Sequence, residues 1–236
     1  MDRLPMARIL FVLITAVPLL IAACGSAGDA QPVAAHRTSV SPILQPERDS
    51  TSPRVVFLGD SLTAGLGLPR DQTVPALIQA RLDADGYNYE AVNAGVSGDT
   101  SAGGVSRLEW SLEGQVAILV VELGGNDGLR GLPVSQLEDN LGDIITRAQQ
   151  RGVTVILTGM EAPPNYGAVY TSEFRQVFRD LADEYDVAFI PFFLEGVAGI
   201  PSLNNADGMH PNSAGAEIVA ETVWRVLEPV LEAQDQ

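Results

Sequence analysis

The sequence has no lysine, one cysteine and two histidines. All 14 basic residues are arginines, against 30 aspartates and glutamates, which gives the 236-residue chain a formal net charge of −16. Nucleic acid is therefore disfavoured as a partner, because phosphate binding needs a basic face. An intrachain disulfide is excluded, and the ligands of a structural zinc domain are missing. The 46% apolar content argues against global disorder.

The start of the chain has the pattern of an export signal. Arg3 and Arg8 precede an apolar run over residues 9–23, which is too short for the roughly 20-residue helix that spans a bilayer. The run ends in small residues before Cys24 and resembles the lipobox of bacterial lipoproteins. We expect residues 1–23 to be a lipoprotein signal peptide and Cys24 to be acylated, which would anchor the protein stably in a membrane. An ordinary secretory signal and an uncleaved anchor are the alternatives.

A tether is expected to follow the lipidated cysteine. Residues 24–53 are rich in Ser, Ala and Pro and have no apolar periodicity, which is typical of a disordered linker. A flexible chain of this length reaches about 30 Å. These features predict a lipoprotein of the bacterial cell envelope that faces the periplasm or the exterior. Whether the anchor lies in the inner or the outer membrane is left open.

Residues 54–236 have the alternating pattern of one α/β domain. Five short apolar or β-branched runs are predicted to be strands: 54–58, 89–93, 116–123, 153–157 and 187–190. Helical patterns follow these runs at 73–84, 101–113, 135–150, 167–184 and 212–232. In the third helix, Ser135 and Glu138 match a capping box. The alternation predicts a parallel sheet with helices on both faces, and such sheets bind ligands beyond the carboxyl ends of their strands.

The loops after the predicted strands contain the residues suited to nucleophilic catalysis. Ser61 follows the first strand, and a serine hydroxyl needs an adjacent base. Asp207 stands three residues before His210, so a turn can bring its carboxylate onto Nδ1 of the imidazole. The N–H groups of Ser61 and Gly95 and the Asn126 amide are candidate donors to an oxyanion. Each feature alone has a plain alternative, such as a turn or a helix cap.

The ordered blocks around these residues resemble the SGNH-hydrolase, or GDSL-esterase, family. The four blocks are Gly-Asp-Ser-Leu at 59–62, Asn-Ala-Gly-Val-Ser-Gly-Asp-Thr at 93–100, Gly-Gly-Asn-Asp at 124–127 and Asp-Gly-Met-His-Pro at 207–211. Residues 128–131, 164–167 and 191–193 extend the resemblance to the bacterial multifunctional thioesterase, lysophospholipase and arylesterase enzymes. The Gly-x-Ser-x-Gly elbow of α/β-hydrolases is not matched, because Thr63 replaces its second glycine.

The resemblance implies a fold and a mechanism. The expected fold is a flavodoxin-like three-layer α/β/α sandwich with a five-stranded parallel sheet. Ser61 would be the nucleophile, His210 the general base and Asp207 the residue that orients it. Ser61, Gly95 and Asn126 would form the oxyanion hole. No metal or organic cofactor is implied, and the protein would act as a monomer on a small-molecule ester or lipid.

The substrate is predicted less directly. Six apolar side chains near the expected active edge are candidate contacts to an acyl chain, with core packing as the alternative for each: Leu62, Leu129, Met160, Tyr166, Phe192 and Met209. Aryl esters, lysophospholipids and acyl thioesters are the expected substrates. A carbohydrate-ester deacetylase on the same scaffold and a non-enzymatic lipoprotein that binds envelope components are the alternatives. A nucleotide-binding protein is disfavoured, because the first loop lacks Gly-x-Gly-x-x-Gly.

Overall fold

The computed structural model describes residues 52–234. The expected signal peptide, the acylated Cys24 and nearly all of the tether lie outside the described residues and stay predictions. None of the helices within residues 52–234 combines the length and the apolar character needed to cross a bilayer.

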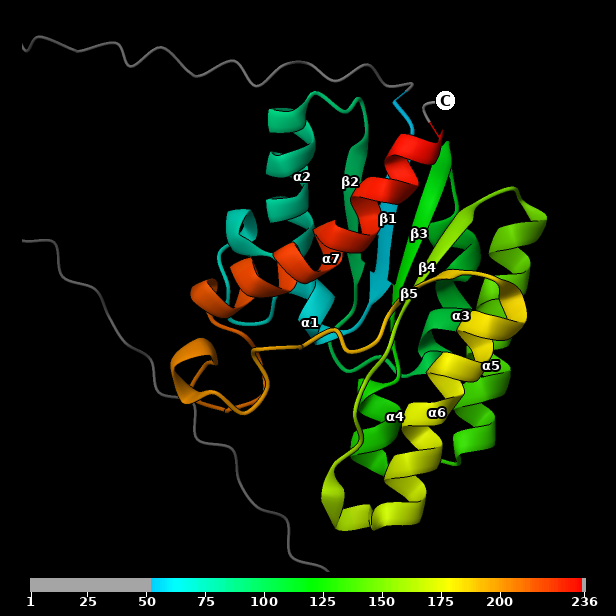
Figure 1. Cartoon of the computed structure of the whole chain (residues 1–236), viewed down its shortest axis with the longest axis vertical. Coiled ribbons are helices and arrows are strands. Elements are labelled where there is room, and N and C mark those ends of the chain that lie inside the picture. Colours follow the sequence, from blue (N-terminus) through cyan, green and yellow to red (C-terminus); the bar gives the residue numbers. More distant parts are fainter. Residues whose placement is uncertain (1–51, 235–236) are drawn as a thin grey trace, which may run out of the picture. The chain divides into compact units, whose positions relative to one another are not determined.

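A five-stranded parallel sheet forms the centre of the domain (Figure 1). Its strands are β1 (Arg54–Gly59), β2 (Glu90–Gly95), β3 (Val116–Glu122), β4 (Thr154–Thr158) and β5 (Ala188–Ile190). The spatial order is β2-β1-β3-β4-β5, which is the flavodoxin-like order of a doubly wound sheet. The middle strand β3 is buried over its last five residues, as its nearly continuous apolar run predicts.

Helices cover both faces of this sheet. Figure 1 shows α2 (Val74–Asp85) and α7 (Ser213–Gln234) on one face. The other face carries α3 (Ser101–Ser111), α5 (Val134–Gln150) and α6 (Ala168–Tyr185). Shorter elements lie in the loops: α1 (Ser61–Ala64), η1 (Arg70–Gln72), α4 (Gly125–Arg130), η2 (Pro164–Tyr166) and η3 (Pro201–Leu203). The expected three-layer sandwich is confirmed.

Helix α5 shows how the amphipathic pattern buries a face and where local signals mislead. Its buried apolar positions recur at helical spacing: Leu137, Leu141, Ile144, Ile145 and Ala148. The helix begins at Val134 after Pro133, and no side chain caps its first turn. The expected capping role of Ser135 is therefore wrong. Pro133 occupies the position before the helix, with a non-helical ψ of 131°, so Ser135 is already the second residue of the helix and not its cap.

The strand register brings the ends of β1, β2 and β3 together at one edge. Gly59 pairs with Gly95 on one side and with Glu122 on the other. Both glycines lie against α1: a Cβ at Gly59 would be 2.1 Å from Thr63 Oγ1, and one at Gly95 would be 2.3 Å from Ala64 N. Only glycine therefore permits this close approach of α1, which carries Ser61 at its first position.

Candidate active site

Ser61, His210 and Asp207 form a continuous hydrogen-bonded chain. The Nε2 atom of His210 lies 2.8 Å from Ser61 Oγ, and its Nδ1 atom lies 2.7 Å from Asp207 Oδ2. The structure thus brings together the three side chains predicted from the sequence, although 149 residues separate His210 from Ser61. These distances suit transfer of the serine proton to the imidazole.

The loop that carries Asp207 holds its carboxylate in place. Asp207 Oδ1 accepts hydrogen bonds from the backbone N–H groups of Met209 and His210, at 2.9 and 3.0 Å. These bonds, with that of Oδ2 to the imidazole, lower the pKa of Asp207 to about 2. The carboxylate is therefore ionised at neutral pH and can hold the Nδ1–H tautomer of His210.

Two asparagines outside the triad brace the loop, Asn204 through its side chain and Asn205 through its backbone. Asn204 is buried, and its amide donates to the carbonyls of Val197 and Ile200 at 2.8 and 2.9 Å. The backbone N–H of Asn205 donates to the His210 carbonyl at 2.7 Å. These supports are not predictable from the sequence, because their partners lie in loops without periodicity.

Asn126 lies on α4, directly beyond β3. Its Nδ2 donates to Asp60 Oδ2 at 2.9 Å, which orients the amide and leaves its second N–H for another acceptor. Asn126 and Ser61 line the same cleft. The predicted proximity of these two residues is therefore confirmed.

Gly95 does not supply the expected oxyanion donor. Its N–H donates to Asn93 Oδ1 at 3.0 Å, and Gly95 does not line the cleft. The predicted role is wrong, because this glycine serves the close packing of α1. Gly98, three residues later, lines the cleft beside Ser61 with a φ of +88°. The sequence offered both glycines in one block, and only their position in the fold distinguishes them.

The cleft beside Ser61 has a volume of about 450 Å³, within the usual range for small-molecule sites. Five of the six predicted apolar contacts line it: Leu62, Leu129, Met160, Phe192 and Met209. Tyr166 does not, so its predicted contact is not supported. The Tyr166 hydroxyl instead donates to the Leu129 carbonyl at 2.9 Å and supports the segment that carries Leu129. Sequence analysis missed other lining residues, among them Leu66, Ser97, Glu161 and Leu194.

A fully buried carboxyl group lies beneath the nucleophile. Glu122 Oε2 accepts hydrogen bonds from Asp60 N–H and Thr63 N–H, both at 3.2 Å, and from the Thr63 hydroxyl at 2.8 Å. Its Oε1 atom has no partner within the described residues. Burial, followed by the nearby charge of Asp60, raises the pKa of Glu122 well above its usual value. The sequence predicted only an apolar strand here.

This buried acid makes stability depend on pH. Because the folded pKa of Glu122 is raised, the folded state loses stability as pH rises from about 4.5 toward that pKa. Glu122→Gln removes this titration and keeps an acceptor oxygen. We therefore expect the difference between the melting temperatures of the variant and the wild type to shift in favour of the variant as pH rises from about 5 to about 8.

Thermal denaturation across this pH range measures the effect. Glu113→Gln is the matched control, because Glu113 is exposed, and it should follow the wild-type curve. Parallel curves for Glu122→Gln and wild type would show that Glu122 does not titrate as described.

Within residues 52–234, no group of three or more His, Cys, Asp or Glu side chains is placed to hold a metal ion.

Comparison with known proteins places the chain among lipolytic enzymes. Residues 57–218 match the GDSL-like Lipase/Acylhydrolase family. The chain is 46% identical over 178 residues to esterase TesA of Pseudomonas aeruginosa, covering 75% of this chain and 89% of that protein. It is 35% identical over 190 residues to thioesterase 1/protease 1/lysophospholipase L1 of Escherichia coli K12, covering 80% and 90%. The solved structure of esterase EstA from Pseudoalteromonas sp., inhibited by monoethylphosphonate, matches with a TM-score of 0.73 and 30% identity, covering 77% and 100%.

Proposed function

The chain belongs to the GDSL-like lipase/acylhydrolase family and is a serine esterase, and we propose that Ser61, His210 and Asp207 act as its catalytic triad on esters with an apolar acyl or aryl group. The contacts of 2.8 and 2.7 Å that link the three side chains support this assignment. The apolar cleft beside Ser61 is the observation that carries the proposed substrate class.

The proposed reaction passes through an acyl-enzyme. His210 Nε2 takes the proton of Ser61 Oγ while this oxygen attacks the ester carbonyl carbon. The tetrahedral intermediate collapses, and the leaving alcohol receives that proton from His210. Water then gives a proton to His210 and attacks the acyl-enzyme, and the proton returns to Ser61 as the carboxylic acid leaves. Asp207 keeps the imidazole oriented and stabilises its positive charge in both steps.

Three donors that line the cleft would form the oxyanion hole. They are the N–H groups of Ser61 and Gly98 and the free N–H of the Asn126 amide. Within residues 52–234, neither backbone N–H has a protein acceptor, and all three residues line the cleft. Donors that are already oriented stabilise the developing charge without reorganisation. Gly98 takes the place first assigned to Gly95.

The charge of the site favours neutral or zwitterionic substrates. Asp60 and Asp207 lie in or beside the cleft, and the whole chain carries a net charge of −16. Glu161 also lines the cleft, but its charge is paired with that of Arg175. Such a field does not attract anionic substrates, such as acyl thioesters of nucleotide carriers. We therefore expect aryl esters and lysophospholipids with neutral head groups to be better substrates than acyl thioesters.

Hydrolysis of p-nitrophenyl esters from acetyl to palmitoyl tests the substrate class. The kcat/KM is expected to peak at a medium or long acyl chain. Leu129→Asp should lower this value for long chains by about 10-fold or more relative to acetyl, because Leu129 lines the cleft and an acid there disfavours apolar contact. Val169→Asp is the matched control, since Val169 is exposed and lies outside the cleft lining.

The outcome also separates the alternatives. A sharp preference for acetyl esters would favour the carbohydrate-ester deacetylase. Equal effects of Leu129→Asp and Val169→Asp on the chain-length profile would contradict an acyl site in this cleft.

We also propose that Cys24 anchors the enzyme in the bacterial cell envelope. The basic start, the apolar run and the single cysteine of the chain support this location. In cells grown with radiolabelled palmitate, the wild-type protein should carry label and fractionate with membranes. Cys24→Ser should carry none, whereas labelling of this variant would rule out the anchor.

A further inference from the structure

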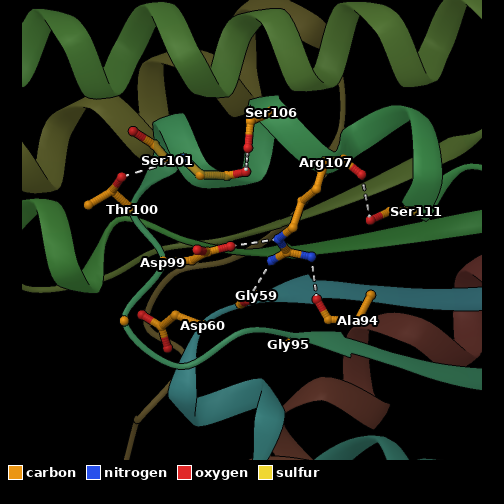
Figure 2. Close-up of polar contacts among 12 residues, drawn as sticks. Gly59, Asp60, Ala94, Gly95, Asp99, Thr100, Ser101, Ser106, Arg107 and Ser111 are labelled. Atoms are coloured by element: carbon orange, nitrogen blue, oxygen red, sulfur yellow. Dashed lines mark hydrogen bonds and ion pairs between the residues drawn. The ribbon is translucent and has the colours of Figure 1, made fainter.

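Arg107 on α3 points its guanidinium at the active edge of the sheet (Figure 2). Its Nε donates to Asp99 Oδ2 at 2.6 Å, its Nη1 to the Ala94 carbonyl at 2.5 Å, and its Nη2 to the Gly59 carbonyl at 2.8 Å. Only 15% of the side chain is exposed. Each nitrogen of the guanidinium thus has an acceptor, and the three acceptors lie in β1, in β2 and in the loop after β2.

These acceptors adjoin the proposed oxyanion donors. Gly59 ends β1 and lies two residues before Ser61. Ala94 is the last residue but one of β2, and Asp99 directly follows Gly98. One planar side chain therefore joins β1, the strand that precedes the nucleophile, to the loop that carries the second backbone donor.

Further contacts hold two of the three Arg107 acceptors, the Gly59 carbonyl and the Asp99 carboxylate. The Gly59 carbonyl also accepts from Val96 N–H at 3.0 Å, so the loop after β2 is held to β1 twice. The Asp99 carboxylate is confined by α3, because a Cβ at Gly103 would lie 2.7 Å from Asp99 Oδ1. A fork with fixed N–H directions transmits this restraint better than a flexible ammonium would.

We propose that Arg107 is a positioning residue that sets the distance between the Ser61 and Gly98 N–H groups and so the shape of the oxyanion hole. The proposal rests on the esterase function proposed above. An error of about 1 Å in such a site can cost about 10²-fold in rate. Arg107 itself does not line the cleft, so it acts through Gly59 and Asp99.

The opposite end of the same two strands offers a matched control. Arg54 also joins neighbouring segments there, with its Nε donating to Glu90 Oε2 at 2.8 Å and its Nη1 to the Glu113 carbonyl at 3.4 Å. Arg54 and Glu90 begin β1 and β2, so they lie at the edge remote from Ser61. Replacing Arg54 removes an arginine contact between strands without reaching the oxyanion donors.

The experiment compares Arg107→Gln and Arg54→Gln in the full-length protein. For p-nitrophenyl butyrate, Arg107→Gln should lower kcat by about 10- to 100-fold with little change in KM, because the oxyanion hole acts mainly in the transition state. Inactivation by an alkyl p-nitrophenyl phosphonate should slow by a similar factor, since its phosphoryl oxygen uses the same donors. Arg54→Gln should change both rates by less than about 2-fold.

Asp99 variants test the route through the ion pair. Asp99→Asn keeps an oxygen that can accept from Arg107 Nε and should stay within about 3-fold of wild type. Asp99→Ala removes the acceptor and should resemble Arg107→Gln. Because both changes break one connection, the double variant should be hardly worse than either single one. If Arg107→Gln does not fold, comparison of Asp99→Asn with Asp99→Ala still tests the proposal.

The possible results separate positioning from plain stability. If Arg107→Gln lowers the melting temperature but leaves kcat and the phosphonate rate unchanged in the folded protein, the residue is structural and the proposal is overturned. A rise in KM alone would overturn it too, as would additive losses in the double variant. Failure of the proposed triad is a distinct result, because Ser61→Ala would then retain turnover.

Discussion

Ester hydrolysis by the Ser61→Ala variant is expected to be about 10⁴- to 10⁶-fold slower than that of the wild type. The substitution removes only the hydroxyl, and without this group the acyl-enzyme cannot form. The oxyanion donors remain, so a small residual rate is expected. The fold should be retained, because the bond to His210 Nε2 is the one hydrogen bond of the Ser61 hydroxyl within residues 52–234.

Two measurements check this result together. Steady-state hydrolysis of p-nitrophenyl butyrate gives the loss in kcat, and mass spectrometry shows whether a phosphonate labels the protein. Ser172→Ala is the matched control, because Ser172 is an exposed serine on α6, and it should keep full activity and labelling. Turnover by folded Ser61→Ala at more than about a hundredth of the wild-type rate would remove Ser61 from the role of nucleophile.

Asp207→Asn should cost about 10⁴-fold in kcat, although it changes one atom. The asparagine oxygen can still accept the N–H groups of Met209 and His210, so the loop should keep its shape. Its NH₂ group would then face His210 Nδ1 and favour the tautomer with the proton on Nε2. That nitrogen would point an N–H at Ser61 and could not accept the serine proton.

The pH profile adds an independent check on Asp207. Because its pKa is lowered to about 2, the carboxylate stays ionised throughout the range of ordinary assays. Protonation of Asp207 should therefore not limit kcat/KM at any pH of such an assay. Asp183→Asn, at an exposed position of α6, is the control and should be as active as wild type. An active Asp207→Asn enzyme would show that this carboxylate does not set the tautomer.

Much of the site could be predicted because its chemistry follows the strand pattern. Ser61 and Asn126 each come directly after a buried strand, and parallel strands bring such loops to one edge. Asp207 and His210 are three residues apart, and a single turn joins their side chains. These relations depend on short stretches of sequence, so they survive even where the boundaries of elements are shifted by a few residues.

Other features could not be predicted, because contacts between distant segments decide them. Glu122 stands in an apolar run, and its burial under Asp60 depends on the pairing of β1 with β3. Tyr166 belongs to a block of the family resemblance, yet its hydroxyl binds the Leu129 carbonyl and its ring does not line the cleft. A residue type and its neighbours in sequence do not specify the direction of a side chain in a loop.

The sequence by itself determined the parallel α/β architecture, the edge of the sheet at which we propose catalysis, and the three side chains that the structure joins there. Periodicity and local turn chemistry are properties of adjacent residues, and they need no knowledge of distant contacts. Only the tertiary structure decided that Gly98 and not Gly95 lines the cleft with Ser61, and that Arg107 joins β1, β2 and the loop after β2. The direction of an N–H group and the reach of a guanidinium depend on strand register and on how α1 and α3 pack against the sheet.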